Sequence, residues 1–170
     1  MSEALVYEAV RTPFGRFAGA LGGIRPDDLA AHALTALLER AGALLGRDPL
    51  ARVVACAADG VDPDVLGLAP VEVVNKALTR AGIGWDAVEV LELNEAFASP
   101  SPACLAGWPE LDPARVNVRG GAIAIGHPLG ASGARILGRL AHELRACGGG
   151  CGVATLCIGV GQGLAMIPQA

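Results

Sequence analysis

The chain has 170 residues, 52% of them hydrophobic and 18% charged, and its 13 basic and 17 acidic side chains give a formal net charge of −4. This length suffices for one packed domain and part of another, since domains usually span about 100–200 residues. The acidic balance, without any run of Lys or Arg, excludes nucleic acid and anionic membranes as main partners, because both require a concentrated positive surface.

The hydrophobic pattern predicts strands and helices that alternate along the chain. Strands are expected at residues 4–7, 52–58, 88–93, 153–158 and 164–167, and helices at 29–41, 70–81 and 132–145. The apolar face of the first helix consists of Leu34, Leu37, Leu38 and Ala41. Such an alternation is typical of the α/β class, with helices layered on a sheet.

Residues 43–50 show neither helical nor strand periodicity, and the pattern restarts after them. We therefore expect a seam there, which divides the chain into residues 1–46 and residues 47–170.

Localisation and redox state follow from what the sequence lacks. No stretch approaches the roughly 20 consecutive apolar residues that span a bilayer, and the first residues do not resemble a secretory signal. The five cysteines are an odd number, which favours reduced thiols over a disulfide framework. We therefore expect a cytoplasmic protein.

His127 lies in a constrained loop between Gly126 and Pro128, shortly before a predicted helix. Pro128 fixes its own φ and restricts His127 to an extended backbone. A general base needs such a fixed orientation, and the alternative is a histidine that only fills a turn. The local pattern leaves both interpretations open.

Cys157 ends a predicted strand and is followed by Gly159, Gly161 and Gly163. Backbone N–H groups beside a reactive thiol are what an oxyanion hole requires, and a neighbouring histidine can take the proton of the thiol. The alternative is a buried structural cysteine.

A third motif, Asn94-Glu95-Ala96-Phe97, directly follows the predicted strand 88–93. The Asn94 amide can cap a helix, or it can hold a water molecule or a carbonyl oxygen in a site.

Together and in this order, the three motifs resemble those of the thiolase family. They read NEAF at 94–97, GGAIAIGHPLGASGAR at 120–135 and CIGVGQG at 157–163. By this resemblance, residues 47–170 correspond to a thiolase C-terminal domain and residues 1–46 to a fragment of the N-terminal domain. The resemblance implies a thiolase-like layered fold. It also implies thiolysis of a 3-oxoacyl-CoA, or the reverse Claisen condensation, by an enzyme with coenzyme A as a substrate and no cofactor or metal.

The resemblance further implies a role for each motif residue. His127 would activate a nucleophilic cysteine and polarise the thioester oxygen, with Asn94 ordering a water beside it. Cys157 would be the acid/base thiol that exchanges a proton with the α-carbon, and the amide of Gly159 would contribute to a second oxyanion hole. The residues that border the acyl group and the pantetheine end of CoA would be Ala96 and Phe97.

The sequence departs from the family where the acylated nucleophile should be. That cysteine lies in a Cys-x-Ser-Gly context in thiolases, whereas Cys56 here precedes Ala-Ala-Asp and Cys104 precedes Leu-Ala-Gly. The segment that carries it is missing between about residues 46 and 52, so we expect at most residual acyl transfer. The alternative function is a non-catalytic remnant or partner-binding module, which pairs with an intact thiolase chain or with a second copy of itself.

Two smaller departures lie near the motifs. Pro100 and Pro102 interrupt a segment that is continuous helix in the family, and an interior proline costs roughly 3 kcal/mol. Arg119 replaces the usual asparagine and places a long charged side chain beside the catalytic loop. From both we expect Asn94 and His127 to be displaced.

Two other kinds of site are weaker. The glycines at 159, 161 and 163 suggest a nucleotide-binding turn, but this turn leads into a strand instead of a phosphate-binding helix. Cys147 and Cys151 lack the matched second pair of a zinc site.

Overall fold

The computed structural model describes residues 4–42, 46 and 48–170. Its strands are β1 (Ala4–Val6), β2 (Ala51–Gly60), β3 (Val88–Leu93), β4 (Cys151–Ile158) and β5 (Gln162–Gln169). Its α-helices are α1 (Pro26–Gly42), α2 (Ala69–Ala81), α3 (Pro100–Ala106), α4 (Ala122–Ile125) and α5 (Leu129–Ala146), and short 3-10 helices lie at Pro63–Leu68, Trp85–Ala87 and Pro113–Arg115. Every strand and helix expected from the sequence is present, and the α/β class is confirmed. The seam expected at residues 43–50 lies partly outside the described residues.

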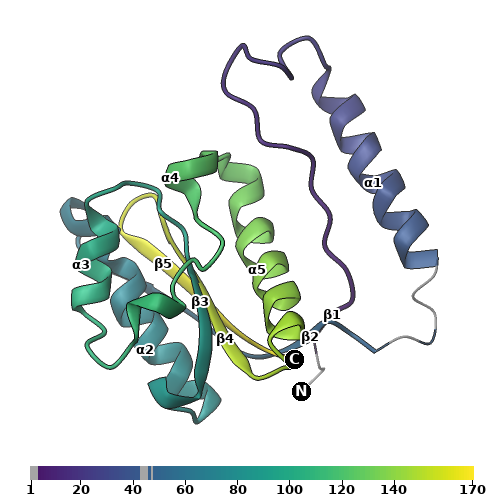
Figure 1. Cartoon of the computed structure of the whole chain (residues 1–170). Helices are drawn as coiled ribbons and strands as arrows, with labels where there is room; N and C mark the ends of the chain where they lie inside the picture. The colour runs from purple at the N-terminus through teal and green to yellow at the C-terminus, as the bar shows by residue number, and fades with distance from the viewer. Residues whose placement is uncertain (1–3, 43–45, 47) are drawn as a thin grey trace.

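The strands form one sheet in the order β1-β2-β5-β4-β3. The pair of β3 and β4 is parallel, with Leu93 opposite Thr155, and the remaining pairs are antiparallel. Because parallel strands end at the same edge of a sheet, Asn94 and Cys157 come to one edge. This is also the edge where the turn between β4 and β5 lies (Figure 1).

Helices cover both faces of this sheet (Figure 1). On one face α2 contributes Val73, Val74, Ala77 and Leu78 to a core shared with β3, β4 and β5. On the other face α5 contributes Ile136, Leu140 and Leu144 to a smaller core. Two layers of helix therefore enclose β3 and β4, which explains why these strands are apolar along most of their length.

From Val90 onward, the side chains of β3 alternate between the two cores. Leu91 and Leu93 belong to the core beneath α2, and Val90 belongs to the core beneath α5. Since successive side chains of a strand point to opposite faces, Glu92 and Asn94 also point toward α5. The two polar residues of the site thus share the face that α5 covers.

The helix α1 stands apart from the sheet at the end of a long extended segment (Figure 1). Glu8, on that segment, forms an ion pair with Arg40 of α1 at 3.6 Å, and its carboxylate lies 3.3 Å from Nε2 of His142 on α5. On the apolar face expected for this helix, Leu34 is 60% exposed and Leu38 is 71% exposed. The sequence therefore predicts the helix correctly, but none of the described residues buries these two leucines.

The two prolines near Asn94 do not break a helix. Pro100 is the first residue of α3 and Pro102 its third, so both lie in the first turn. Backbone N–H groups in a first turn have no partner within the helix, and proline is tolerated there. The expected cost of an interior proline is therefore wrong for this chain.

The core beneath α5 provides a test of the fold. Leu140 is fully buried in it, so we expect Leu140→Ala to lower the free energy of unfolding by about 2–5 kcal/mol, through the loss of apolar contact and the cavity left behind. The matched control is Leu38→Ala on α1, which should change the free energy of unfolding by less than about 0.5 kcal/mol. Urea unfolding measures both, and equal effects of the two substitutions would contradict this packing.

Candidate functional site

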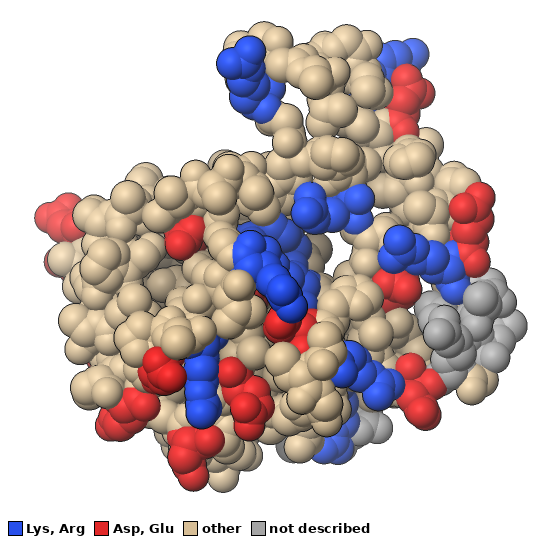
Figure 2. Space-filling view, viewed as in Figure 1, with Lys and Arg blue, Asp and Glu red and all other residues tan. Residues whose placement is uncertain are grey.

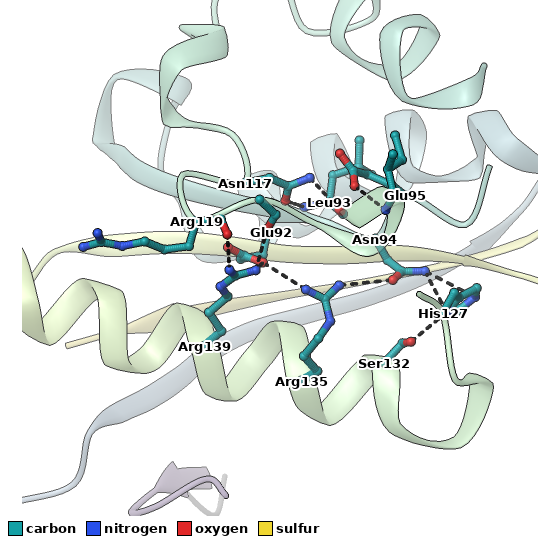
Figure 3. A network of polar contacts seen from close by, with 12 residues as sticks. Glu92, Leu93, Asn94, Glu95, Asn117, Arg119, His127, Ser132, Arg135 and Arg139 are labelled. Atoms are coloured by element: carbon teal, nitrogen blue, oxygen red, sulfur yellow. Dashed lines mark hydrogen bonds and ion pairs between the residues drawn. The ribbon is translucent and has the colours of Figure 1, made fainter. Parts of the chain in front are cut away.

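The candidate site lies where β3 and β4 end and where the loop before α5 approaches them (Figure 3). Asn94 is almost fully buried, and its backbone N–H donates to the Thr155 carbonyl at 2.9 Å. Its amide Nδ2 lies 3.4 Å from both ring nitrogens of His127. The strand that carries Asn94 thus holds this amide against the loop histidine.

Ser132 fixes the other side of the His127 ring. The Nδ1 atom of His127 lies 2.6 Å from Ser132 Oγ, and this hydroxyl donates to the Pro128 carbonyl at 3.0 Å. Ser132 is fully buried in the first turns of α5. The His127 loop is therefore tied to the helix that follows it.

Beneath Asn94, the buried carboxylate of Glu92 lies close to two arginines of α5 (Figure 3). Its Oε2 is 3.8 Å from Nη1 of Arg135 and 3.6 Å from Nη1 of Arg139. The arginines are four residues apart, which places them on the same face of the helix. Arg135 also donates from Nη2 to Asn94 Oδ1 at 3.3 Å. This ion cluster of Glu92, Arg135 and Arg139 lies directly behind the amide that contacts His127.

Burial dominates the electrostatics of the ion cluster. It raises the pKa of Glu92 to about 7, although Arg139 and Arg135 both act to lower it. Burial likewise lowers the pKa of Arg135, against the attraction of Glu92. Among the described residues, neither oxygen of Glu92 has a hydrogen-bond partner, because the arginine nitrogens lie beyond hydrogen-bond distance.

Two backbone-binding side chains shape the loop between β3 and α5. Asn117 accepts from the Leu93 N–H and donates to the Leu93 carbonyl, both at 2.9 Å, and it has a φ of 47°. Glu95 accepts from the N–H of Ile123 at 2.9 Å, near the N-terminus of α4. A Cβ at Gly121 would collide with the Glu95 carboxylate, which would have to shift from its place beside the Ile123 N–H.

Arg119 does not disturb the site as expected from the sequence. Its guanidinium forms an exposed ion pair with Glu143 of α5, with nitrogen-to-oxygen distances of 3.1 Å. The carbonyls of Arg119 and Gly120 accept from Arg139. The long charged side chain thus points along α5, and Asn94 and His127 stay in contact.

Cys157 lies beside a small cavity whose lining also includes Asn94, Ala96, Phe97 and Cys104. Its volume is about 10 Å³, near the smallest that holds one water molecule. Burial raises the pKa of the Cys157 thiol, and it raises that of Cys104 to about 11. Asn94 both contacts His127 and lines the cavity of Cys157, so it joins the two halves of the site.

The turn after Cys157 is open. Val160 and Gly161 have positive φ values of 62° and 80°, and nothing lies within 4 Å of where a Cβ of Gly159 would be. A ligand therefore has access to the backbone of this turn.

A much larger cavity lies elsewhere. It measures about 560 Å³ and separates the segment around Arg11 and the helix α1 from α5, and it is visible as a hollow with arginines at its rim (Figure 2). Its lining includes Arg135 and Arg139 but not Asn94, His127 or Cys157. It therefore adjoins the ion cluster and lies apart from the thiol.

The comparison with family models decides the family. The family description "Thiolase, C-terminal domain" matches residues 47–170, which is most of the chain. The chain belongs to the thiolase family.

Individual thiolases agree with this assignment. An acetyl-CoA acetyltransferase of Syntrophomonas wolfei is 48% identical over 155 residues, which are 90% of this chain and 38% of that protein. A beta-ketoadipyl-CoA thiolase of Pseudomonas aeruginosa is 51% identical over 122 residues, 71% of this chain and 30% of that protein. The crystal structure of human mitochondrial 3-ketoacyl-CoA thiolase in complex with CoA superposes with a TM-score of 0.69 at 45% identity, over 78% of this chain and 33% of that one. The chain thus spans about a third of the length of these thiolases.

Sequence reasoning missed the residues that support this candidate site from behind. Glu92, Asn117 and Arg135 were not candidates, although the sequence contained a signal for two of them. In the largely apolar strand β3, Glu92 is the charged residue whose side chain faces α5. Arg135 lies on the inner face of α5, beside Ile136. When two neighbouring elements each carry a charged residue at a buried position, the two residues are expected to form an ion pair.

Within the described part of this thiolase chain, no group of three or more His, Cys, Asp or Glu side chains is placed to hold a metal ion. Nor is any described helix long and apolar enough to cross a membrane.

The raised pKa of Glu92 predicts how stability depends on pH. Between the ordinary value of 4.5 and about 7, the folded state binds a proton that the unfolded chain has released, so the free energy of unfolding should fall as pH rises through this window. Between about pH 4.5 and pH 8, we expect the free energy of unfolding of the wild type to fall by up to about 3 kcal/mol more than that of Glu92→Gln. Urea unfolding across this range measures the difference. The control Glu89→Gln, at an exposed position of the same strand, should show the same dependence of the free energy of unfolding on pH as the wild type. The same dependence in Glu92→Gln would contradict the prediction.

Proposed function

We propose that the site performs the acid/base half of thiolase chemistry on an acyl-CoA thioester, with acyl-CoA and CoA as substrates and no cofactor. The observation that carries this proposal is the position of Asn94, which contacts His127 and lines the same cavity as Cys157. Membership of the thiolase family and the similarity to a thiolase bound to CoA support it.

In the proposed reaction, Cys157 acts on the α-carbon of the acyl group. Because burial raises the pKa of its thiol, Cys157 starts protonated and needs a base. His127 takes that proton, and the resulting thiolate removes a proton from the α-carbon while the electron pair moves onto the thioester oxygen. The protonated ring of His127, and a water held by Asn94, then stabilise the negative oxygen.

The substrate would approach from the open side of the site. Phe97 is 56% exposed and Ala96 is half-buried, so both can border the acyl group and the pantetheine arm. Gly159 is exposed in the turn after Cys157, and its N–H would contribute to a second oxyanion hole.

The covalent step of a complete thiolase is not part of this proposal. Cys104 lines the cavity, but its pKa of about 11 and its hydrogen bond to the Gly67 carbonyl make it a poor nucleophile. Cys56 is exposed on β2, and β5 lies between β2 and β4, the strand that carries Cys157. Residual thiolysis is therefore the most that the described cysteines support.

A second candidate function is a partner-binding module, and the exposed leucines of α1 favour it. Leu34 and Leu38 present apolar surface that an intact thiolase chain or a second copy would cover. This candidate predicts no proton exchange with acyl-CoA. The cytoplasmic location stays a prediction from the sequence.

Proton exchange separates the two candidates, because it needs Cys157 but no acylated nucleophile. We expect the protein to catalyse the incorporation of deuterium from D₂O into the methyl group of acetyl-CoA. The substitution Cys157→Ser should reduce the rate by at least about a hundredfold, since a general base typically contributes that much. Mass spectrometry or proton NMR of acetyl-CoA measures the exchange.

The matched control is Cys56→Ser, which removes an exposed thiol away from the site and should leave the rate unchanged. Exchange no faster than in buffer, or equal exchange in Cys157→Ser and the wild type, would refute the proposed function.

A further inference from the structure

The cavity beside the ion cluster is bounded by three parts of the chain, which are α1, α5 and the extended segment after β1. The extended segment crosses α5 so closely that a Cβ on Gly138 would collide with the Cβ of Ala9. Glu8, next to this crossing, pairs with Arg40 of α1 at 3.6 Å and lies 3.3 Å from Nε2 of His142 on α5. These contacts hold α1 beside α5, with a space of about 560 Å³ between them.

The walls of this cavity are mainly apolar, and small side chains face it from both helices. The small residues are Ala30 and Ala33 on α1 and Gly130, Ala131 and Ala134 on α5. Phe14 and Leu29 add larger apolar surface. Sites for small organic molecules typically have volumes of about 300–1,000 Å³ and a mainly apolar lining with a few polar groups. The volume and the walls therefore suit the apolar chain of a ligand.

One side of the cavity carries positive charge. Arg11, Arg135 and Arg139 all line it, whereas no Asp or Glu among the described residues does so. The carboxylate of Glu92 contacts Arg135 and Arg139 from outside the cavity, at 3.8 and 3.6 Å. One carboxylate thus faces three arginines, and a concave surface lined by one sign of charge attracts the opposite ion.

Two of these arginines lack the partners that their charge requires. Arg135 is 6% exposed, and its Nε and Nη1 have no hydrogen-bond partner within the described part of the chain. Arg11 pairs with no described acidic residue, and its guanidinium instead lies over the Phe14 ring, 5.4 Å from the ring centre. Arg11 is also exposed, so a ligand in the cavity can reach it. A carboxylate fits the planar guanidinium with two parallel hydrogen bonds.

We propose that this cavity binds an amphipathic carboxylate of the fatty-acid class, with the carboxylate at Arg11 and the apolar chain between α1 and α5. The bound chain would cover the small side chains that face each other across the cavity. Asn94, His127 and Cys157 do not line this cavity, so the proposal goes beyond the proposed function and does not depend on it.

Isothermal titration calorimetry with decanoate, below the concentration at which it forms micelles, tests the proposal. We expect saturable binding of decanoate, and binding of hexanoate that is at least about tenfold weaker, because each buried CH₂ raises affinity roughly fourfold. In Arg11→Gln, the affinity for decanoate should fall about threefold, as expected for an exposed ion pair. The matched control is Arg145→Gln, an exposed arginine of α5 outside the cavity, which should bind as the wild type does.

Two further variants fill the cavity from opposite walls. Ala134→Leu on α5 and Ala33→Leu on α1 each place a larger side chain where the ligand chain would lie, so each should lower the affinity for decanoate at least about tenfold. If one of them fails to fold, the other keeps the test valid. The matched control is Leu38→Ala, which removes exposed apolar surface of α1 outside the cavity and should leave the affinity unchanged.

The absence of decanoate binding would overturn the proposal, as would equal affinities for decanoate and hexanoate or full affinity in a folded cavity-filling variant. Loss of affinity in Leu38→Ala would place the ligand on the exposed leucines and would also overturn it. Unchanged affinity in Arg11→Gln would refute the position of the carboxylate. Deuterium exchange into acetyl-CoA tests the proposed function separately, so either proposal can fail while the other stands.

Discussion

Glu92 is a fully buried carboxylate on the strand that ends at Asn94, and α5 supplies the charges that face it. Because an unpaired buried charge costs several kcal/mol, Glu92 and Arg135 can be buried only together, and the partly exposed Arg139 adds a second positive charge beside Glu92. Arg135 also binds the Asn94 amide, and Arg139 binds the carbonyls of the loop that leads toward His127. One electrostatic requirement therefore holds the end of β3, the start of α5 and the loop between them in a fixed relation.

Much of the fold follows from the sequence because its signals are local. The periodicities of β3 and α2, and the glycine that ends α2 with a φ of 70°, identify these elements to within a residue. The exposure of Leu34 and Leu38 could not be predicted, since the pattern of a helix shows which face is apolar but not what covers it. The prolines of α3 were misjudged because the first residue of a helix is the least certain feature of a sequence pattern.

The residues closest to the proposed chemistry were also identified from sequence, by motif and not by geometry. The structure brings Asn94 into contact with His127 and places it at the cavity of Cys157. The supporting residues escaped notice because their importance depends on contacts between distant segments. Arg135 lies 41 positions after Asn94, and the Leu93–Asn117 contact spans 24 positions. Only the alternation of β3, combined with the helical period of α5, would have shown that Glu92 and Arg135 face each other.

We propose that this chain, about a third of the length of its thiolase relatives, presents an assembled acyl-CoA site. Titration of the ¹⁵N-labelled protein with acetyl-CoA, followed by amide NMR shifts, tests this claim most directly. We expect saturable shifts concentrated at Ala96, Phe97, His127 and Gly159, and small shifts in α1. The absence of shifts at these residues, or shifts confined to α1 and the large cavity beside it, would contradict it.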